Sequence, residues 1–81
     1  MDYLIGQIVL LPYARRDIRG LMRCEGQVLP IHNYAALFSL ITSQYGGDGQ
    51  TTFALPNLKS KSPLEGMAYY IVTEGLYPSF E

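Results

Sequence analysis

The residues of this chain whose types could support catalysis are few, and they stand apart from one another. His32 is the only histidine and Cys24 the only cysteine among 81 residues. A nucleophilic thiol needs a base within reach, and no histidine motif accompanies Cys24. A zinc site would need His32 from several symmetry-related chains, because one imidazole cannot hold the ion. We therefore expect no enzyme, no metal and no cofactor, with Cys24 a small buried hydrophobe and His32 a residue near the start of a helix.

The segment Tyr45–Gln50 is rich in glycine, and glycines expose backbone N–H groups that could bind phosphate. It lacks the Gly-Lys-Ser/Thr ending of a P-loop, and Asp48 with Asp2 falls short of the oxygen ligands that calcium requires. The favoured interpretation is structural, because glycine reaches backbone conformations that other residues resist. The predicted turn glycines are Gly26, Gly46, Gly47 and Gly49.

Three cations close together form the one candidate ligand site. Arg15, Arg16 and Arg19 could bind an anionic glycan or a phosphate through bidentate hydrogen bonds. Asp17 lies among them, so the segment could equally be a solvated loop. The acidic residues elsewhere are scattered and form no carboxylate pair for glycoside hydrolysis.

The composition favours association with other proteins. Hydrophobic residues make up 48% of the chain and charged residues 16%, against roughly 25% charged in ordinary domains. Seven tyrosines add side chains that are favoured at interfaces. The net charge of −1 gives no electrostatic basis for nucleic-acid binding, and the apolar run Tyr3–Pro12 is too short for a membrane span. Asp2 stands where a signal peptide would carry basic residues, so no signal peptide is expected.

The hydrophobic pattern predicts the strands and the helix that position these residues. Strands are expected at Leu4–Leu11 and Met67–Thr73, and an extended segment at Phe53–Leu58. Two short strands, Leu21–Cys24 and Gln27–Pro30, are expected to form a hairpin around Gly26. Apolar residues at helical spacing predict one helix over His32–Ser43, with Asn33 as its N-cap. These elements indicate a single α+β domain over residues 1–81.

Both terminal strands are apolar on both faces, whereas one helix covers only one face of a small sheet. The remaining face and the open strand edges would then be covered by loops or by another copy of the chain. We therefore expect the fold to be completed by contacts between subunits. The expected assembly residues are Ile5, Ile8, Val9, Leu11, Met67, Tyr69, Tyr70, Ile71, Val72 and Tyr77.

A series of short motifs runs in order along nearly the whole chain. They are Ile5–Ile8, Arg19-Gly20, Cys24–Gln27, Leu29–Ile31, Ala36–Ile41, Tyr45–Gly49, Phe53–Lys59, Tyr69–Ile71 and Gly75–Ser79. In this order they resemble the phage tail-collar domain, which also occurs in bacterial proteins labelled microcystin-dependent.

The chain departs from the family pattern at three places. Ile18 and Leu21 stand where the family usually has proline and tryptophan, and Arg23 fills a usually apolar position. The last residues, Phe80-Glu81, differ from the family's usual basic ending. Longer relatives carry a long insert before the final strand, where this chain has only Ser60–Glu65. If recognition in those relatives resides in the insert, this chain keeps only the assembling part.

The resemblance implies a structural subunit of a phage tail, a tail fibre or an extracellular fibre, without enzymatic activity. The implied partners are further copies of the chain, as a homotrimer or a linear polymer, together with other tail proteins. The implied location is the virion tail or a fibre at the cell surface. The alternative is an adhesin module that recognises cell-surface glycans through Arg15, Arg16 and Arg19 together with exposed tyrosines.

Overall fold

The computed structural model of the chain describes residues 3–12, 18–61 and 63–79. Within them lie five strands, one α-helix and one 3₁₀ helix, which confirms the α+β fold class. The elements are β1 (Ile8–Leu11), β2 (Leu21–Arg23), β3 (Val28–Pro30), η1 (Ile31–Asn33), α1 (Ala35–Ile41), β4 (Thr52–Ala54) and β5 (Ala68–Val72).

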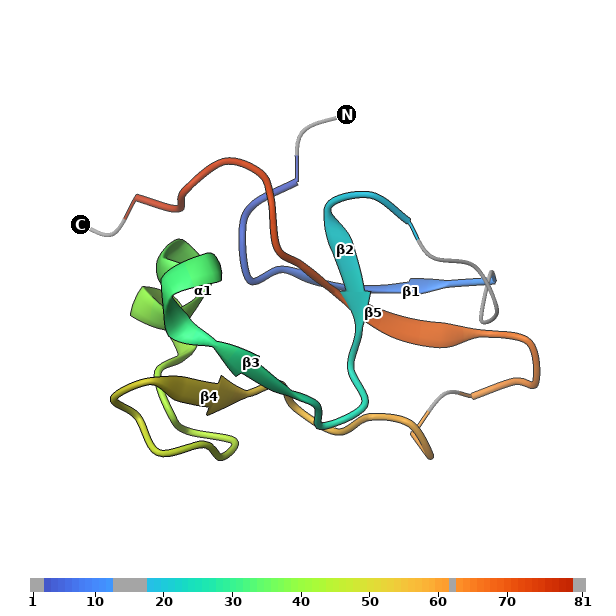
Figure 1. Ribbon diagram of the computed structural model, residues 1–81. Coiled ribbons are helices and arrows are strands. Elements are labelled where there is room, and N and C mark those ends of the chain that lie inside the picture. The colour runs from blue at the N-terminus through green and yellow to red at the C-terminus, as the bar shows by residue number, and fades with distance from the viewer. Residues whose placement is uncertain (1–2, 13–17, 62, 80–81) are drawn as a thin grey trace.

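The C-terminal strand β5 lies between β1 and β2, and among the described residues the three form an antiparallel sheet of order β1-β5-β2 (Figure 1). Ile71 in β5 lies opposite both Ile8 and Met22. The last strand therefore joins two segments that are adjacent in sequence but do not pair with each other.

The segment that enters β1 contains a β-bulge. Gly6 donates its N–H to the carbonyl of Val72 at 2.9 Å, and Val72 donates its own N–H to the carbonyl of Gln7 at 2.9 Å. Gly6 and Gln7 thus both lie opposite Val72. This extra residue bends the chain and shortens the strand predicted at Leu4–Leu11. Gly6 meets the bend with a positive φ of 87°, so the observed strand starts only at Ile8.

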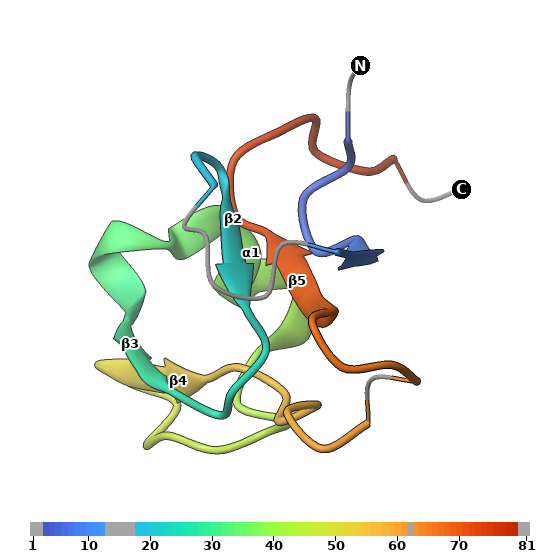
Figure 2. The ribbon, with the colours of Figure 1, turned by 90° about the vertical axis from the view of Figure 1, so that its right-hand side faces the viewer.

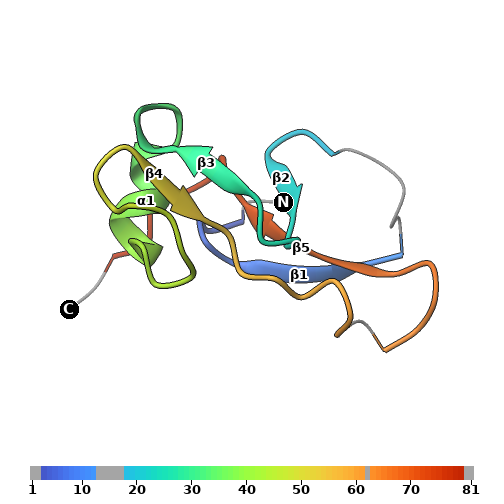
Figure 3. The same ribbon diagram turned by 60° about the horizontal axis from the view of Figure 1, so that its bottom comes forward.

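The predicted hairpin around Gly26 is wrong. β2 pairs with β5, whereas β3 pairs with β4 in a separate two-stranded sheet. Gly26 takes a positive φ of 76°, but the turn sends the chain from one sheet to the next (Figure 3). Leu29 lies opposite Phe53 in the second sheet, so the partner of this strand comes from residues well beyond the helix.

The helix is shorter than predicted. Residues 31–33 form the 3₁₀ turn η1, and α1 starts only at Ala35. The N-cap is Tyr34 without a side-chain hydrogen bond, so the assignment of Asn33 as the cap is wrong. Thr42 ends α1 with a φ of 52° while its N–H still bonds to the carbonyl of Phe38.

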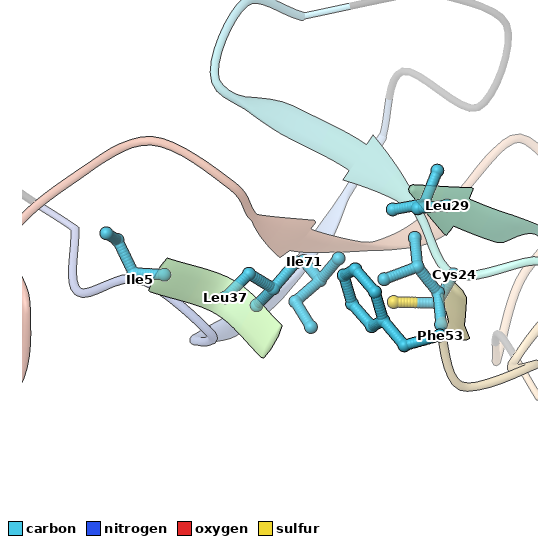
Figure 4. Packing of buried hydrophobic residues seen from close by; sticks show 7 residues of the cluster. Ile5, Cys24, Leu29, Leu37, Phe53 and Ile71 are labelled. Carbon is cyan, nitrogen blue, oxygen red and sulfur yellow. The ribbon is translucent and has the colours of Figure 1, made fainter. Parts of the chain in front are cut away.

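The core joins both sheets to the helix. Ile71 of β5, Leu37 of α1 and Phe53 of β4 are each no more than 1% exposed. Figure 4 shows these side chains as one row, which continues to Ile5 at one end and Leu29 at the other. Phe38 packs edge-on against Phe53, with ring centroids 5.4 Å apart. Burying large side chains of this kind stabilises each by roughly 1.5–3 kcal/mol.

The two ends of the described chain run beside each other above α1 (Figures 1 and 2). Ile5 donates its N–H to the carbonyl of Leu76 at 2.8 Å, and Leu76 donates to the carbonyl of Tyr3 at 2.9 Å. Leu4 and Leu76 thereby form an isolated parallel bridge. The chain ends are therefore held in the fold by backbone hydrogen bonds.

Candidate functional site

The outer edge of β1 is the first candidate site, because its backbone polar groups alternate in direction. Val72 donates to the Gln7 carbonyl, so Gln7 faces β5. By the antiparallel alternation, Val9 and Leu11 face β5 as well, while the N–H and C=O groups of Ile8 and Leu10 point away from it. Within the described part of the chain nothing pairs with this outer side.

The side chains of β1 make the same edge apolar. Its sequence is Ile-Val-Leu-Leu, with no charged residue in the strand. Ile8 is 42% exposed, and the other three residues are half-buried. The buried cluster and the residues packed against it, as far as the structure describes the chain, include no side chain from β1. An apolar edge without a charge is the kind that natural sheets usually protect.

The opposite edge, β2, is partly occupied by local hydrogen bonds. Cys24 donates to the Tyr69 carbonyl and Thr73 to the Gly20 carbonyl, so even-numbered residues of β2 face β5 and its outer side belongs to Leu21 and Arg23. The Leu21 N–H donates to the Ile18 carbonyl at 3.0 Å.

The Arg23 carbonyl is also occupied. It accepts hydrogen bonds from the Glu25 N–H at 3.1 Å and from the Gln27 side chain at 2.8 Å. Among the described residues, the three-stranded sheet therefore has one edge partly occupied by local hydrogen bonds and one edge whose outward groups have no partner.

The expected assembly residues separate into two groups. Tyr70, Ile71 and Val72 are at most 1% exposed and Ile5 is 9% exposed. Of the two kinds of cover expected for the second face of the C-terminal strand, the subunit itself supplies it here, because the consecutive buried residues at the end of β5 point to both faces. These four residues hold the subunit together and offer almost no contact surface. Surface remains at Ile8, Val9, Leu11, Met67, Tyr69 and Tyr77.

The arginine cluster falls mostly outside the described residues, where Arg15 and Arg16 lie. Arg19 is exposed and lines an open hollow of about 350 Å³ together with Tyr3 and Glu74. An aromatic ring, a cation and a carboxylate around one hollow are a suitable set for a sugar, because the ring can stack and the charged groups can bind hydroxyls. Gly20 and Gly75 also line the hollow.

The glycine-rich segment 45–50 is organised around Asp48. The Asp48 carboxylate accepts hydrogen bonds from the N–H groups of Gln50, Thr51 and Thr52, each at 2.8 Å, and from the Thr51 hydroxyl at 2.7 Å. These bonds, with that of the Thr52 backbone contributing most, hold the pKa of Asp48 well below its usual range. The carboxylate is thus committed to its own loop.

The glycines of this segment and Gly26 adopt positive φ angles, namely 76° at Gly26, 136° at Gly46, 86° at Gly47 and 76° at Gly49. Gly47 is the most restricted, because a Cβ there would lie 2.4 Å from the Cα of Phe53. A side chain at position 47 would therefore strike the backbone of β4.

Cys24 is 1% exposed, and burial raises the pKa of its thiol to about 11. His32 is exposed in η1. Among the described residues no three His, Cys, Asp or Glu side chains gather in a way that could hold a metal ion. In the same residues, no helix has the length and apolar character needed to cross a bilayer.

One side-chain contact between α1 and the C-terminal segment was not predicted from the sequence. The Ser39 Oγ on α1 lies 2.6 Å from the Tyr77 hydroxyl. Tyr77 is 54% exposed, and the bridged residues Leu4 and Leu76 are 45% and 55% exposed. Nothing in the spacing of two residues this far apart predicts the pair. The exposure of Leu76 and Tyr77 is indicated by the sequence, because the two residues follow a turn and precede a proline.

These features define a class of protein, namely a small α+β structural domain with an open apolar sheet edge. The model of the phage tail collar domain matches residues 6–63. The chain therefore belongs to the phage tail collar domain family, which confirms the resemblance, and the family assigns it a structural role in a phage tail. No curated protein and no solved structure matches the chain. The matched region ends before β5, so the resemblance of Tyr69–Ser79 to the family's C-terminus stays a prediction.

Proposed function

We propose that this chain is a non-enzymatic structural subunit that assembles with copies of itself in a phage tail, a tail fibre or an extracellular fibre. The family supports the tail setting. Self-assembly is supported by one observation above all, which is the amount of surface that the isolated subunit exposes.

The exposed surface is larger than a compact monomer of this mass needs. The chain exposes 5601 Å², whereas the scaling of folded monomers gives about 4,900 Å² for 9.1 kDa. The excess of roughly 700 Å² is close to the ~800 Å² that each partner buries in a standard interface. One interface per subunit would remove the excess.

Large apolar side chains contribute to that surface from several elements. The exposed ones are Leu4, Ile8, Val28, Tyr45, Leu64, Leu76 and Tyr77. They lie on β1, on β3, in loops and at both chain ends, so the exposed apolar side chains are spread over more than one part of the surface. Two distinct surfaces on one subunit are what a linear polymer requires, whereas one heterologous contact that closes gives a ring such as a trimer.

Sedimentation velocity of the purified chain at micromolar concentration tests the proposal. A species heavier than 9.1 kDa that persists on dilution is expected, and negative-stain microscopy then distinguishes trimers from filaments. A monomer over the whole concentration range would overturn self-assembly.

The hollow at Tyr3, Arg19 and Glu74 favours a second function, an adhesin module that binds cell-surface glycans. A glycan array tests it with the chain itself and with Arg19→Ala. Specific binding that is lost in Arg19→Ala, and in Arg15→Ala with Arg16→Ala, would support the adhesin. Absence of binding by the unmodified chain would reject it, and unchanged assembly in the arginine variants would keep the two functions separate.

A further inference from the structure

We propose that β1 is a self-pairing strand, and that the β1 strand of a second copy of this chain lies antiparallel against it across a two-fold axis, with Val9 facing the partner's Val9. The inference rests on the proposed self-assembly and names the contact that mediates it. Such a pair joins two three-stranded sheets into one continuous sheet.

The backbone of β1 is complementary to itself. Ile8 and Leu10 direct their N–H and C=O groups outward, and among the described residues these groups have no partner. When a second β1 runs antiparallel, Ile8 exchanges two hydrogen bonds with the partner's Leu10. Leu10 exchanges two with the partner's Ile8. All four outward groups of each copy are then satisfied.

Neighbouring registers satisfy fewer groups. If Leu10 faced the partner's Leu10, Ile8 would face the partner's Pro12, which has no N–H to donate. If Ile8 faced the partner's Ile8, Leu10 would face the partner's Gly6, whose N–H is already bonded to Val72. The register centred on Val9 is therefore the one that uses every outward donor and acceptor of the strand.

The side chains agree with this register. Val9 would pack directly against the partner's Val9, and Ile8 against the partner's Leu10, so every cross-strand pair is apolar. The 42% exposed Ile8 side chain would become covered. No charge lies within β1 to oppose the approach of a second copy, in contrast to Arg23 at the end of β2.

A two-fold contact has a consequence for symmetry. It is isologous and closes after two copies, so it does not by itself build a threefold ring. A polymer arises when a second surface joins such pairs, and the exposed Leu4, Leu76 and Tyr77 at the chain ends offer one. The proposal therefore favours paired subunits in a filament over the threefold arrangement.

Disulfide trapping tests the register. The native Cys24 is 1% exposed and stays out of the reaction. Val9→Cys is expected to oxidise to a covalent dimer, because Cα atoms of facing residues in a non-hydrogen-bonded antiparallel pair lie about 4.5 Å apart, within disulfide range. Ile8→Cys and Leu10→Cys alone are expected to stay largely uncrosslinked, whereas a mixture of the two forms a dimer. Faster crosslinking of Ile8→Cys or Leu10→Cys alone would overturn the register.

A backbone variant tests the edge itself. Leu10→Pro removes an N–H that faces away from β5, so an edge strand tolerates it, and two hydrogen bonds of the dimer are lost. The dissociation constant of the dimer is expected to rise about 30-fold while the circular dichroism spectrum is retained. The matched control Val9→Pro removes an N–H that faces β5 and is expected to disrupt the fold.

The outcomes separate the contact from the function. A wild-type chain that stays monomeric overturns both. A wild-type chain that assembles, combined with no dimer from Val9→Cys and undiminished assembly of folded Leu10→Pro, overturns the β1 contact and leaves self-assembly intact.

Discussion

The Ser39 Oγ and the Tyr77 hydroxyl lie 2.6 Å apart, although the two residues are separated by 38 positions in the sequence. The bond fastens the C-terminal segment to α1, on the side where the chain ends run together. Ser39 also donates to the Ala36 carbonyl at 2.7 Å, so in this arrangement the Tyr77 hydroxyl is the donor to Ser39. The contact links α1 to the segment that follows β5.

Removing this bond is expected to loosen the C-terminal segment with little effect on the rest of the fold. Tyr77→Phe and Ser39→Ala should each reduce the free energy of unfolding by about 0.5 kcal/mol, because the bond is exposed and exchanges readily with water. In a double-mutant cycle measured by urea unfolding, the two losses should fail to add. Tyr45→Phe, an exposed tyrosine on another loop, is the matched control and should change nothing. Fully additive losses would show that the bond does not form in solution.

The glycine loop is expected to tolerate no side chain at position 47. In Gly47→Ala, the new Cβ would lie 2.4 Å from the Cα of Phe53 and 2.7 Å from its N. Backbone atoms cannot yield as a side chain would, so a loss of about 4 kcal/mol or more is expected, measured by urea unfolding.

Gly66→Ala is the matched control for this substitution. Gly66 has a φ of 81°, similar to the 86° of Gly47, but a Cβ there meets nothing within 4 Å. In Gly66→Ala the free energy of unfolding should therefore fall by only about 1–2 kcal/mol, which is the cost of placing alanine in a left-handed backbone conformation. Equal losses in the two variants would mean that backbone strain alone, and not contact with Phe53, restricts Gly47.

The α+β class and the position of most elements follow from local patterns, and the pairing of the strands does not. Leu21–Cys24 and Gln27–Pro30 carry every signal of a hairpin, including Gly26 between them, yet their partners are β5 and β4. Local spacing reports whether a segment is extended, whereas the partner is decided by what else the core must cover. Here Ile71 lies opposite Met22 of β2 and Phe53 lies opposite Leu29 of β3, and both Ile71 and Phe53 belong to one buried cluster with Leu37.

The candidate site, like the fold, is predicted in part by local sequence and depends in part on the topology. The apolar character of Ile8 and Val9 is visible in the sequence, and so is the low charge of the chain. That β1 is an edge, and that Tyr70 and Val72 are covered within the subunit, depends on the order β1-β5-β2. The sequence therefore indicates which strands are apolar, and only the topology says which of them has surface left for a partner.

The Asp48 carboxylate is expected to make stability depend on pH in the acid range. Its pKa is lowered in the fold by the bonds from Thr52, Thr51 and Gln50, whereas an unfolded chain has a value of about 3.9. The unfolded state therefore takes up the proton first as pH falls. The stabilisation is present above about pH 4 and is lost below it, as pH falls toward and through the lowered folded value.

The variant Asp48→Asn isolates this effect, because Asn keeps an acceptor oxygen but cannot be protonated. At pH 7 the urea midpoint of the natural chain should exceed that of Asp48→Asn, and the gap should narrow steadily below about pH 4. Glu65→Gln, on an exposed residue for which no hydrogen bond is described, serves as the control. A gap that stays constant down to pH 2 would refute the assigned role of the carboxylate.

Burial of Cys24 is expected to make its thiol inert in the folded chain. The thiol is 1% exposed and its pKa is raised to about 11, against about 8.5 in an unfolded chain. At pH 8 the reactive thiolate is therefore scarce in the fold as well as inaccessible, and iodoacetamide should label Cys24 only through unfolding. The labelling rate should rise with urea in parallel with the unfolding transition.

The raised pKa of Cys24 also makes the stability of the fold depend on pH in the alkaline range. Its contribution is fully present below about pH 8.5 and is lost as pH rises toward 11, since the unfolded state releases the proton first. Cys24→Ala keeps the site apolar and should remove this alkaline loss, at the expense of packing around Phe53 and Ile71. Rapid labelling of the folded chain at pH 8 would contradict the buried position of the residue.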